Sequence, residues 1–242
     1  MTQQFYVSPE QVMKDRADFA RKGIARGRSV VVISAADGIA LVAENPSPSL
    51  HKIGEIYDKI AFAAVGKYNE FESLRQAGVR YADVRGYSYD REDVTARGLA
   101  SVYAQSLGAV FTAEQKPFEV ELAVAEVGSS QDSDHLYRLT FDGSIADEKG
   151  FIAMGGQVES VHAAVATTWA PGLGLSEAIK LAVHALSAGP QQNSEQAAGR
   201  VPAELGAETL EVAVLDRDSE TTRGKARSFR RLGFEEITAA LT

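Results

Sequence analysis

Arg28 and Ser29 stand at the head of the first strand that the sequence predicts, where a cut chain end could form a nucleophile. A residue freed at the N-terminus can use its own amine as the general base for its side-chain hydroxyl. Here 27 residues precede Arg28, and a guanidinium group is not a nucleophile. Ser29 lies one position later and is blocked in the same way. We therefore expect no catalytic activity; the alternative is a hydrolase of the N-terminal-nucleophile type that uses Ser29 after processing.

Other constellations that carry chemistry are missing from the sequence. The histidines are His51, His135, His162 and His184. They are scattered, with no H-E-x-x-H motif and no carboxylate at metal-ligand spacing, so we expect no metal site. The glycines of 172–177 lack the third glycine of a dinucleotide-binding loop, which predicts a turn. No G-x-S-x-G motif and no G-x-x-x-x-G-K-[ST] motif is present, and we expect no cofactor.

A capped helix and a hairpin must position the strand head. An S-x-x-Q capping box begins at Ser8, and the proline that follows suits the first helical position, which predicts a helix ending at Gly27. Its apolar stripe is thin, so we expect this helix to lie on a surface. Asp37-Gly38 between two β-branched runs predicts a β-hairpin over 29–43.

Strand blocks and helix pairs alternate along the rest of the chain. Strands are predicted at 52–56, 60–65, 119–124, 135–141, 144–147, 151–156, 210–215 and 225–232. Helices are predicted from Asn69 to about Gly78, from Asp90 through Val110, over 158–169 and 176–188, and from Phe234. Hairpin-connected strands that alternate with helix pairs favour antiparallel sheets flanked by helices over a doubly wound parallel sheet. The predicted fold class is therefore α+β.

Composition indicates a soluble chain with a substantial core. The chain has 242 residues with 45% hydrophobic content, and no Pro/Ser/Gly linker divides it, so we expect one domain over 1–242. The net charge of −8 argues against nucleic acid as a partner. Zero cysteines exclude disulfides and thiolate metal sites. Because no signal core or membrane-length apolar run is present, we expect no membrane contact and a cytoplasmic location.

Several short motifs occur in a specific order and spacing. They are Ser8-Pro9-Glu10, the hairpin through Asp37-Gly38 to Glu44, Lys52-Ile53, Lys116-Pro117-Phe118, Tyr137-Arg-Leu-Thr-Phe-Asp-Gly-Ser144 and Ala153-Met-Gly-Gly156. Together they resemble the α-type subunits of the proteasome core particle (20S), most closely the actinobacterial kind, over nearly the whole chain. The resemblance implies a four-layer αββα sandwich over 28–242, of the N-terminal nucleophile hydrolase fold, with an extra N-terminal helix over 8–27.

The resemblance also implies that the chain does not catalyse. Catalytic members of the family use an N-terminal threonine, an aspartate and a lysine, and the corresponding positions here are Arg28, Glu44 and Lys52. The implied role is instead that of a non-catalytic subunit in intracellular protein degradation. Seven copies would form an outer ring on a barrel of proteasome β subunits, with residues 1–7 as a gating tail that converges on the pore.

Three sets of site residues follow from the resemblance. The gate comprises Gln3, Gln4, Phe5, Tyr6, Val7, Ser8 and Pro9, without the Tyr-Asp pair of eukaryotic and archaeal gates. The C-terminal tail of a hexameric ring ATPase or another activator would dock at Lys52 and Gly66, since an ammonium in a partly desolvated groove suits a terminal carboxylate. The loop 111–116, with Phe111, Thr112 and Lys116, resembles the pore constriction.

Each of these residues also has an ordinary interpretation. Lys52 taken alone is more often a solvated lysine at a strand end, and Phe111 is more often a packing residue. The third interpretation of the chain, after the ring subunit and the processed hydrolase, is a monomeric binding module. Its size in solution would identify it.

Overall fold

The strands form two five-stranded antiparallel sheets in the computed structural model, which describes residues 8–156, 158–188, 205–218 and 227–242. The first sheet contains β1 (Val30–Ala35), β2 (Gly38–Glu44), β8 (Phe151–Met154), β9 (Leu210–Asp216) and β10 (Phe229–Arg231), in the order β10-β9-β2-β1-β8. The second contains β3 (Ile53–Tyr57), β4 (Ile60–Gly66), β5 (Val120–Glu126), β6 (His135–Leu139) and β7 (Ile145–Glu148), paired in chain order.

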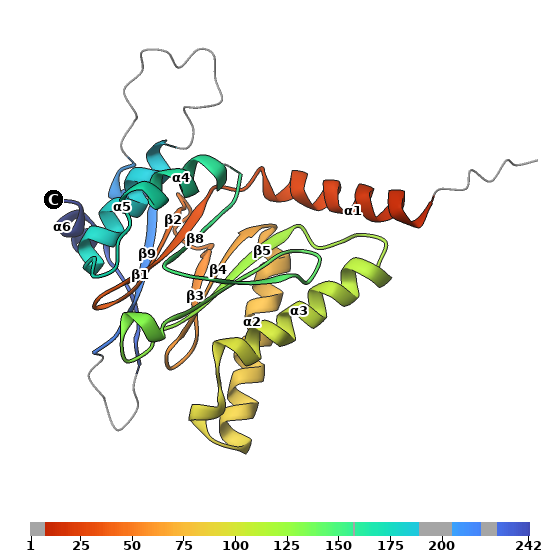
Figure 1. Cartoon of the computed structure of the whole chain (residues 1–242), viewed down its shortest axis with the longest axis horizontal. Helices are drawn as coiled ribbons and strands as arrows, with labels where there is room; N and C mark the ends of the chain where they lie inside the picture. Colours follow the sequence, from red (N-terminus) through yellow and green to blue (C-terminus); the bar gives the residue numbers. More distant parts are fainter. Residues whose placement is uncertain (1–7, 157, 189–204, 219–226) are drawn as a thin grey trace, which may run out of the picture.

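Helices cover the outer face of each sheet (Figure 1). Those on the first sheet are α4 (Val158–Thr168), α5 (Leu175–Ala188) and α6 (Phe234–Leu241), whose buried residues share one apolar cluster with that sheet. Those on the second are α2 (Tyr68–Ser88) and α3 (Ala96–Ala113). The helix α1 (Pro9–Ile24) extends from one end of the sandwich. The predicted four-layer α+β sandwich with an added N-terminal helix is confirmed.

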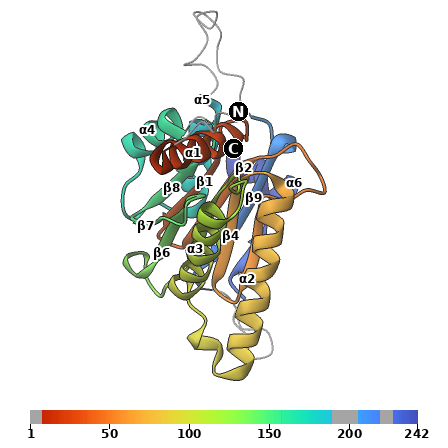
Figure 2. The ribbon, with the colours of Figure 1, turned by 90° about the vertical axis from the view of Figure 1, so that its right-hand side faces the viewer.

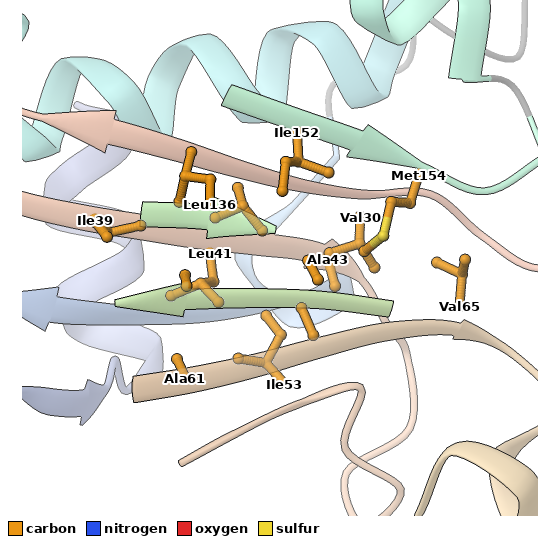
Figure 3. Packing of buried hydrophobic residues seen from close by; sticks show 14 of the residues in the cluster. Val30, Ile39, Leu41, Ala43, Ile53, Ala61, Val65, Leu136, Ile152 and Met154 are labelled. Carbon is orange, nitrogen blue, oxygen red and sulfur yellow. The ribbon is translucent and has the colours of Figure 1, made fainter. Parts of the chain in front are cut away.

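The two sheets face each other across an apolar layer (Figure 3). Side chains alternate along β1, so that Val30 and Val32 point between the sheets while Val31 and Ile33 point to the helices. β1 is therefore apolar on both faces, and so is β4, whose residues form a continuous buried run. Figure 3 labels members of the inner layer: Val30, Ile39, Leu41, Ala43, Ile53, Ala61, Val65, Leu136, Ile152 and Met154. This layer fixes how the first sheet lies on the second.

The helix pair on the second sheet differs from the sequence prediction. The first of these helices, α2, continues past Gly78 to Ser88 and lies beside α3 (Figure 2). Gly78 does not end the helix, because it packs against Tyr103 of α3. A Cβ at that glycine would lie 1.8 Å from the Tyr103 hydroxyl, so the glycine permits a close helix crossing rather than a helix end. Asp90 caps only the short 3₁₀ helix 91–93, and Thr95 caps α3 by accepting from Gly98 N.

Among the described residues, α2 is the longest helix, at 21 residues. It is amphipathic and carries charged side chains along its length. None of the helices in the described ranges combines the length and the apolar character that crossing a bilayer requires.

A buried ion pair joins both sheets at the far end of β1. The carboxylate of Asp134 accepts from both terminal nitrogens of Arg217, at 2.7 and 2.9 Å, and both side chains are almost fully buried. Arg217 also donates to the backbone oxygens of Ala35, Ala36 and Gly128. Because all these partners are satisfied, the desolvated charges are compensated locally. The predicted hairpin lies here and is confirmed, with its turn at residues 36 and 37.

Candidate functional site

A tight joint between α1 and β1 holds Arg28 at the strand head. The backbone nitrogen of Gly156 donates to the carbonyl of Gly27 at 3.1 Å. Gly155 has a φ of +114°, and a Cβ there would lie 2.8 Å from the Cα of Ser29. Both positions need glycine, since a Cβ at Gly156 would collide with the Ala25 carbonyl and one at Gly155 with the backbone of Ser29. The glycine pair therefore fixes the path by which the helix enters the sheet.

Ser29 is buried in this joint, with 8% of its surface exposed. Its nitrogen is a peptide nitrogen, because the described chain runs from the helix through Arg28 without a break. Its carbonyl accepts from Glu44 N at 3.3 Å, which ties it into the hairpin. With residues 8–28 attached, Ser29 has no amine that could serve as its general base.

Lys52 lies beside this joint and directs its ammonium at backbone oxygens. Its Nζ donates to the carbonyl of Arg28 at 2.8 Å and to the carbonyl of Glu44 at 3.2 Å. Burial lowers the pKa of Lys52 to about 8, and the nearby charge of Arg28 acts in the same direction, while the charges of Glu44 and Glu211 oppose it. The ammonium is thus partly desolvated and has neutral acceptors.

Arg28 and Glu44 form an ion pair of their own next to Lys52. The distance from Arg28 Nε to Glu44 Oε1 is 3.2 Å, and the Glu44 side chain is the more buried partner, with 25% exposed against 49% for Arg28. Arg28, Glu44 and Lys52, the three positions that the resemblance matched to a nucleophile, an aspartate and a lysine, are therefore adjacent. Arg28 and Glu44 pair with each other, and the ammonium of Lys52 remains outside this ion pair.

The carboxylate of Glu211 fixes the loop that carries Lys52. Glu211 lies on β9 and is buried. Its partners come from the loop and from the neighbouring strands: Asn45 Nδ2, the backbone nitrogens of Lys52 and Ile53, His51 Nδ1 and a terminal nitrogen of Arg231. Since these donors surround both oxygens, Glu211 positions the backbone of Lys52 without pairing with its ammonium.

Gly66 is the last residue of β4, the second strand after Lys52. Its φ is +109°, and a Cβ there would lie 1.9 Å from the Glu119 carbonyl oxygen. A Cβ on Gly27 would in turn lie 3.3 Å from the nitrogen of Gly66. The absence of side chains lets the helix–strand joint, β4 and β5 meet closely at this point.

The predicted constriction residues are not all in a loop. Phe111 and Thr112 belong to the last turn of α3, and Phe111 packs on Phe141 with ring centroids 5.7 Å apart. Lys116 is in the exposed segment beyond, where its Nζ lies 2.6 Å from Glu70 Oε1 and 3.0 Å from Glu119 Oε2. The expectation of one loop over 111–116 is wrong, because the helix continues through Ala113.

Arg16 connects α1 to this end of α3. Its guanidinium donates to the carbonyl of Phe111 at 2.7 Å and to that of Thr112 at 3.1 Å. These are carbonyls at the C-terminal end of a helix whose last turn contains no basic residue, so a cation from elsewhere satisfies them. The contact spans two elements that the sequence separates widely.

A family model described as proteasome subunit matches residues 24–198. The chain belongs to the proteasome subunit family. The predicted resemblance to the actinobacterial α kind is also confirmed. The chain is 79% identical to proteasome subunit alpha of Renibacterium salmoninarum, over 100% of this chain and 96% of the relative. The corresponding protein of Pseudarthrobacter chlorophenolicus is 75% identical over all of both chains. That of Kineococcus radiotolerans is 63% identical over 96% of this chain and 94% of its own.

Two of the predicted gate residues of this proteasome subunit lie in the described part. Ser8 accepts from Gln11 N at 3.2 Å and so caps α1, and Pro9 is the first helical residue, as predicted. Gln3, Gln4, Phe5, Tyr6 and Val7 lie outside the described residues.

Sequence reasoning missed Glu211 and Arg16 in this proteasome subunit. Glu211 is separated from Asn45 by 166 residues and from Lys52 by 159, so no local pattern connects them. One signal was available, namely a carboxylate second in a strand whose next four residues, 212–215, are apolar. Arg16 lies among several charged residues of α1, and nothing in its spacing sets it apart.

Proposed function

We propose that this chain is a non-catalytic α-type ring subunit that controls entry to a proteolytic chamber and docks activator tails at Lys52. The observation that carries the proposal is the state of the Lys52 ammonium. It is partly desolvated and held by two backbone carbonyls, which leaves its charge uncompensated. A terminal carboxylate supplies the missing negative charge and forms a charge-assisted hydrogen bond.

The joint at Arg28 supports the non-catalytic role. The site of a freed N-terminal nucleophile is occupied by an arginine in continuous chain, and the glycine pair 155–156 holds that chain against the sheet. Intact mass spectrometry of the mature chain tests this directly. A chain that retains residues 1–28 agrees with the ring role, whereas cleavage before Ser29 would favour the processed hydrolase.

The assembly proposal is a heptameric ring of this chain stacked on proteasome β subunits, with a hexameric ring ATPase as the activator. Weak tails that engage several equivalent pockets at once gain avidity from their effective concentration. Native mass spectrometry of complexes purified from the source cells tests it. A barrel-sized particle with a processed threonine subunit supports the ring, and a monomer or a dimer contradicts it.

Docking is tested by Lys52→Ala in the assembled particle. We expect normal assembly and loss of stimulation by the ring ATPase, because the docking carboxylate loses the ammonium with which it pairs. Lys59→Ala is the matched control, since Lys59 is an exposed lysine in the turn at the other end of β3. Normal stimulation of the Lys52 variant would remove this residue from the role.

The gate proposal concerns residues 1–7, which precede the capped start of α1. Deleting them should raise hydrolysis of short peptides by the particle in the absence of an activator. Combining the deletion with Lys52→Ala should leave the raised rate unchanged, since an open pore no longer needs docking. Unchanged hydrolysis after the deletion would exclude this segment as the gate.

The segment 112–116, rather than Phe111, is the candidate for the pore constriction. Phe111 is partly buried in the core, while 112–116 are exposed beyond it. We propose that Thr112 and Lys116 line the pore and that Phe111 supports them from behind. A Thr112→Glu variant should slow the degradation of an unfolded protein more than that of a tetrapeptide.

A further inference from the structure

The two carboxylates nearest to Lys52 are both engaged by other cations. Glu44 pairs with Arg28, and Glu211 is enclosed by its own donors, which include Arg231. In the ranges that the structure describes, no carboxylate lies within ion-pair distance of Lys52 Nζ, whose acceptors are two carbonyls. The electrostatic surroundings of Lys52 therefore depend on the residue that binds Glu44.

We infer that Arg28 is a positioning residue for carboxylate binding at Lys52, because its guanidinium neutralises Glu44 and holds it away from the ammonium. The inference rests on the proposed docking of activator tails at Lys52. It adds a specificity element that lies on the first strand rather than in the loop that carries the lysine.

Geometry gives Glu44 two ways to interfere with binding once Arg28 is removed. The backbone oxygen of Glu44 already accepts from Lys52 Nζ, so the residue is adjacent to the ammonium. Its freed carboxylate could pair with Lys52 and occupy the position of an incoming tail. It would also repel that tail, since like charges in a partly desolvated site interact more strongly than in bulk water.

The same arrangement explains why a cation stands at position 28. A hydroxyl residue there would leave Glu44 unpaired next to Lys52, and the two would neutralise each other. Arginine prevents this because it remains protonated at all physiological pH values and places its Nε 3.2 Å from Glu44 Oε1. The residue that removes the nucleophile thus keeps the neighbouring lysine available.

The test measures peptide binding to the particle assembled with its β subunits. The probe is a fluorescein-labelled octapeptide with the C-terminal sequence of the ring ATPase from the same cells, and its C-terminal amide is the reference. Fluorescence anisotropy gives Kd for the wild type, Arg28→Ala, Glu44→Gln and the double variant. Arg26→Ala is the matched control, because Arg26 is exposed and forms no ion pair with the described residues.

Arg28→Ala should weaken binding about fivefold, the size expected for one partly exposed charge pair. Glu44→Gln and the double variant should both bind within about twofold of the wild type, since the interfering carboxylate is gone. Arg28→Lys should preserve binding, and Arg26→Ala should change it less than twofold. Native mass spectrometry confirms that each variant is assembled.

Two results would overturn the inference while leaving the proposed function intact. One is unchanged binding in Arg28→Ala. The other is an equal loss when Arg28→Ala is made in the Glu44→Gln background, because Arg28 would then attract the tail directly. If the amide peptide bound the wild type as tightly as the free carboxylate, or if Lys52→Ala bound normally, the proposed function and the inference would both fail.

Discussion

Two lysines near the end of β4 have opposite surroundings. Lys52 accepts a backbone hydrogen bond from Ala64, and its ammonium contacts two carbonyl oxygens. Lys116 contacts the carboxylates of Glu70 and Glu119. Burial disfavours the charged form of both lysines. The pKa of Lys52 is lowered to about 8, whereas the pKa of Lys116 is raised, because its two carboxylate partners outweigh the effect of burial.

The difference distinguishes a lysine that stabilises the fold from one that is available to a ligand. Lys116 has its counter-ions within the chain and joins α2 to the start of β5. Lys52 has an uncompensated charge. Its backbone is held by two hydrogen bonds: its nitrogen donates to Glu211 Oε2, and its carbonyl accepts from Ala64 N. An ammonium of this second kind gains most from an external anion.

The largest effect is expected from Gly66→Ala, which would disrupt the backbone that the two lysine sites share. A Cβ there would collide with the Glu119 carbonyl in a backbone conformation that alanine rarely adopts. We expect a loss of about 3 kcal/mol or more in the free energy of unfolding. Gly174→Ala is the control, because a Cβ at Gly174 meets only a flexible side chain at 3.7 Å. Equal thermal midpoints for the two variants would contradict this explanation.

The carboxylate that fixes the Lys52 loop, Glu211, should contribute more to the free energy of unfolding than Glu70, which pairs with Lys116. Glu211→Gln leaves the partly exposed guanidinium of Arg231 without its negative partner and replaces a buried carboxylate by an amide that cannot accept from all of its donors, and we expect a loss of about 2–3 kcal/mol. Glu70→Gln should cost about 1 kcal/mol, since its main partner, Lys116, keeps Glu119. Chemical denaturation of the purified protein measures both values. A larger loss at Glu70 would mean that the carboxylates around Lys116 are the more important ones.

Binding at Lys52 should depend on pH in a range where Lys116 does not titrate. Because the pKa of Lys52 is lowered to about 8, its ammonium is lost as the pH rises through that value. Tail-peptide affinity should be nearly constant up to about pH 7 and fall by up to about tenfold per pH unit above 8. In Lys52→Arg the affinity should not change over pH 6.5–9.5, since guanidinium stays protonated. A parallel decline in that variant would assign the effect to another group.

The smallest expected effects have opposite signs. Lys116→Met removes a compensated cation and should lower stability by about 1 kcal/mol. Lys52→Met removes a cation whose burial disfavours the charged form, and should raise stability at pH 7 by less than about 1 kcal/mol. The folded pKa of Lys52 is about 8 and the unfolded value is 10.5, so this gain should shrink as the pH rises between them. Stabilities that change in the same direction would contradict the comparison.

Patterns within a few residues predicted the fold well. The Asp37-Gly38 signal, the cap at Ser8 and the apolar run of β4 are local, and the structure confirms each of them. The predicted helix end at Gly78 was wrong because a contact with an element distant in sequence determines the local structure there. Gly78 suggests a helix end by itself, yet the approach of Tyr103 makes it an interior residue.

The candidate site was predictable only through its motif. The Lys52-Ile53 pair identified the lysine by resemblance, but its carbonyl acceptors and the Arg28–Glu44 pair depend on how the hairpin folds beside β3. Glu211 could not be connected to Lys52, because the contact closes a segment of 159 residues. The sequence therefore identified the ammonium of Lys52, but not the contacts of Glu44 and Glu211 that keep their carboxylates from pairing with it.

The position of β9 has a consequence for the synthesis of this chain on the ribosome. This strand pairs with β2 along its whole length, from Gly38–Asp216 to Glu44–Leu210, although the two are far apart in sequence. Until residue 216 has emerged, the hairpin that was made first presents an unpaired and apolar edge, which is a template for aggregation. The nascent chain must therefore keep that edge covered, or fold late, and Arg217 follows immediately to close the far end with Asp134.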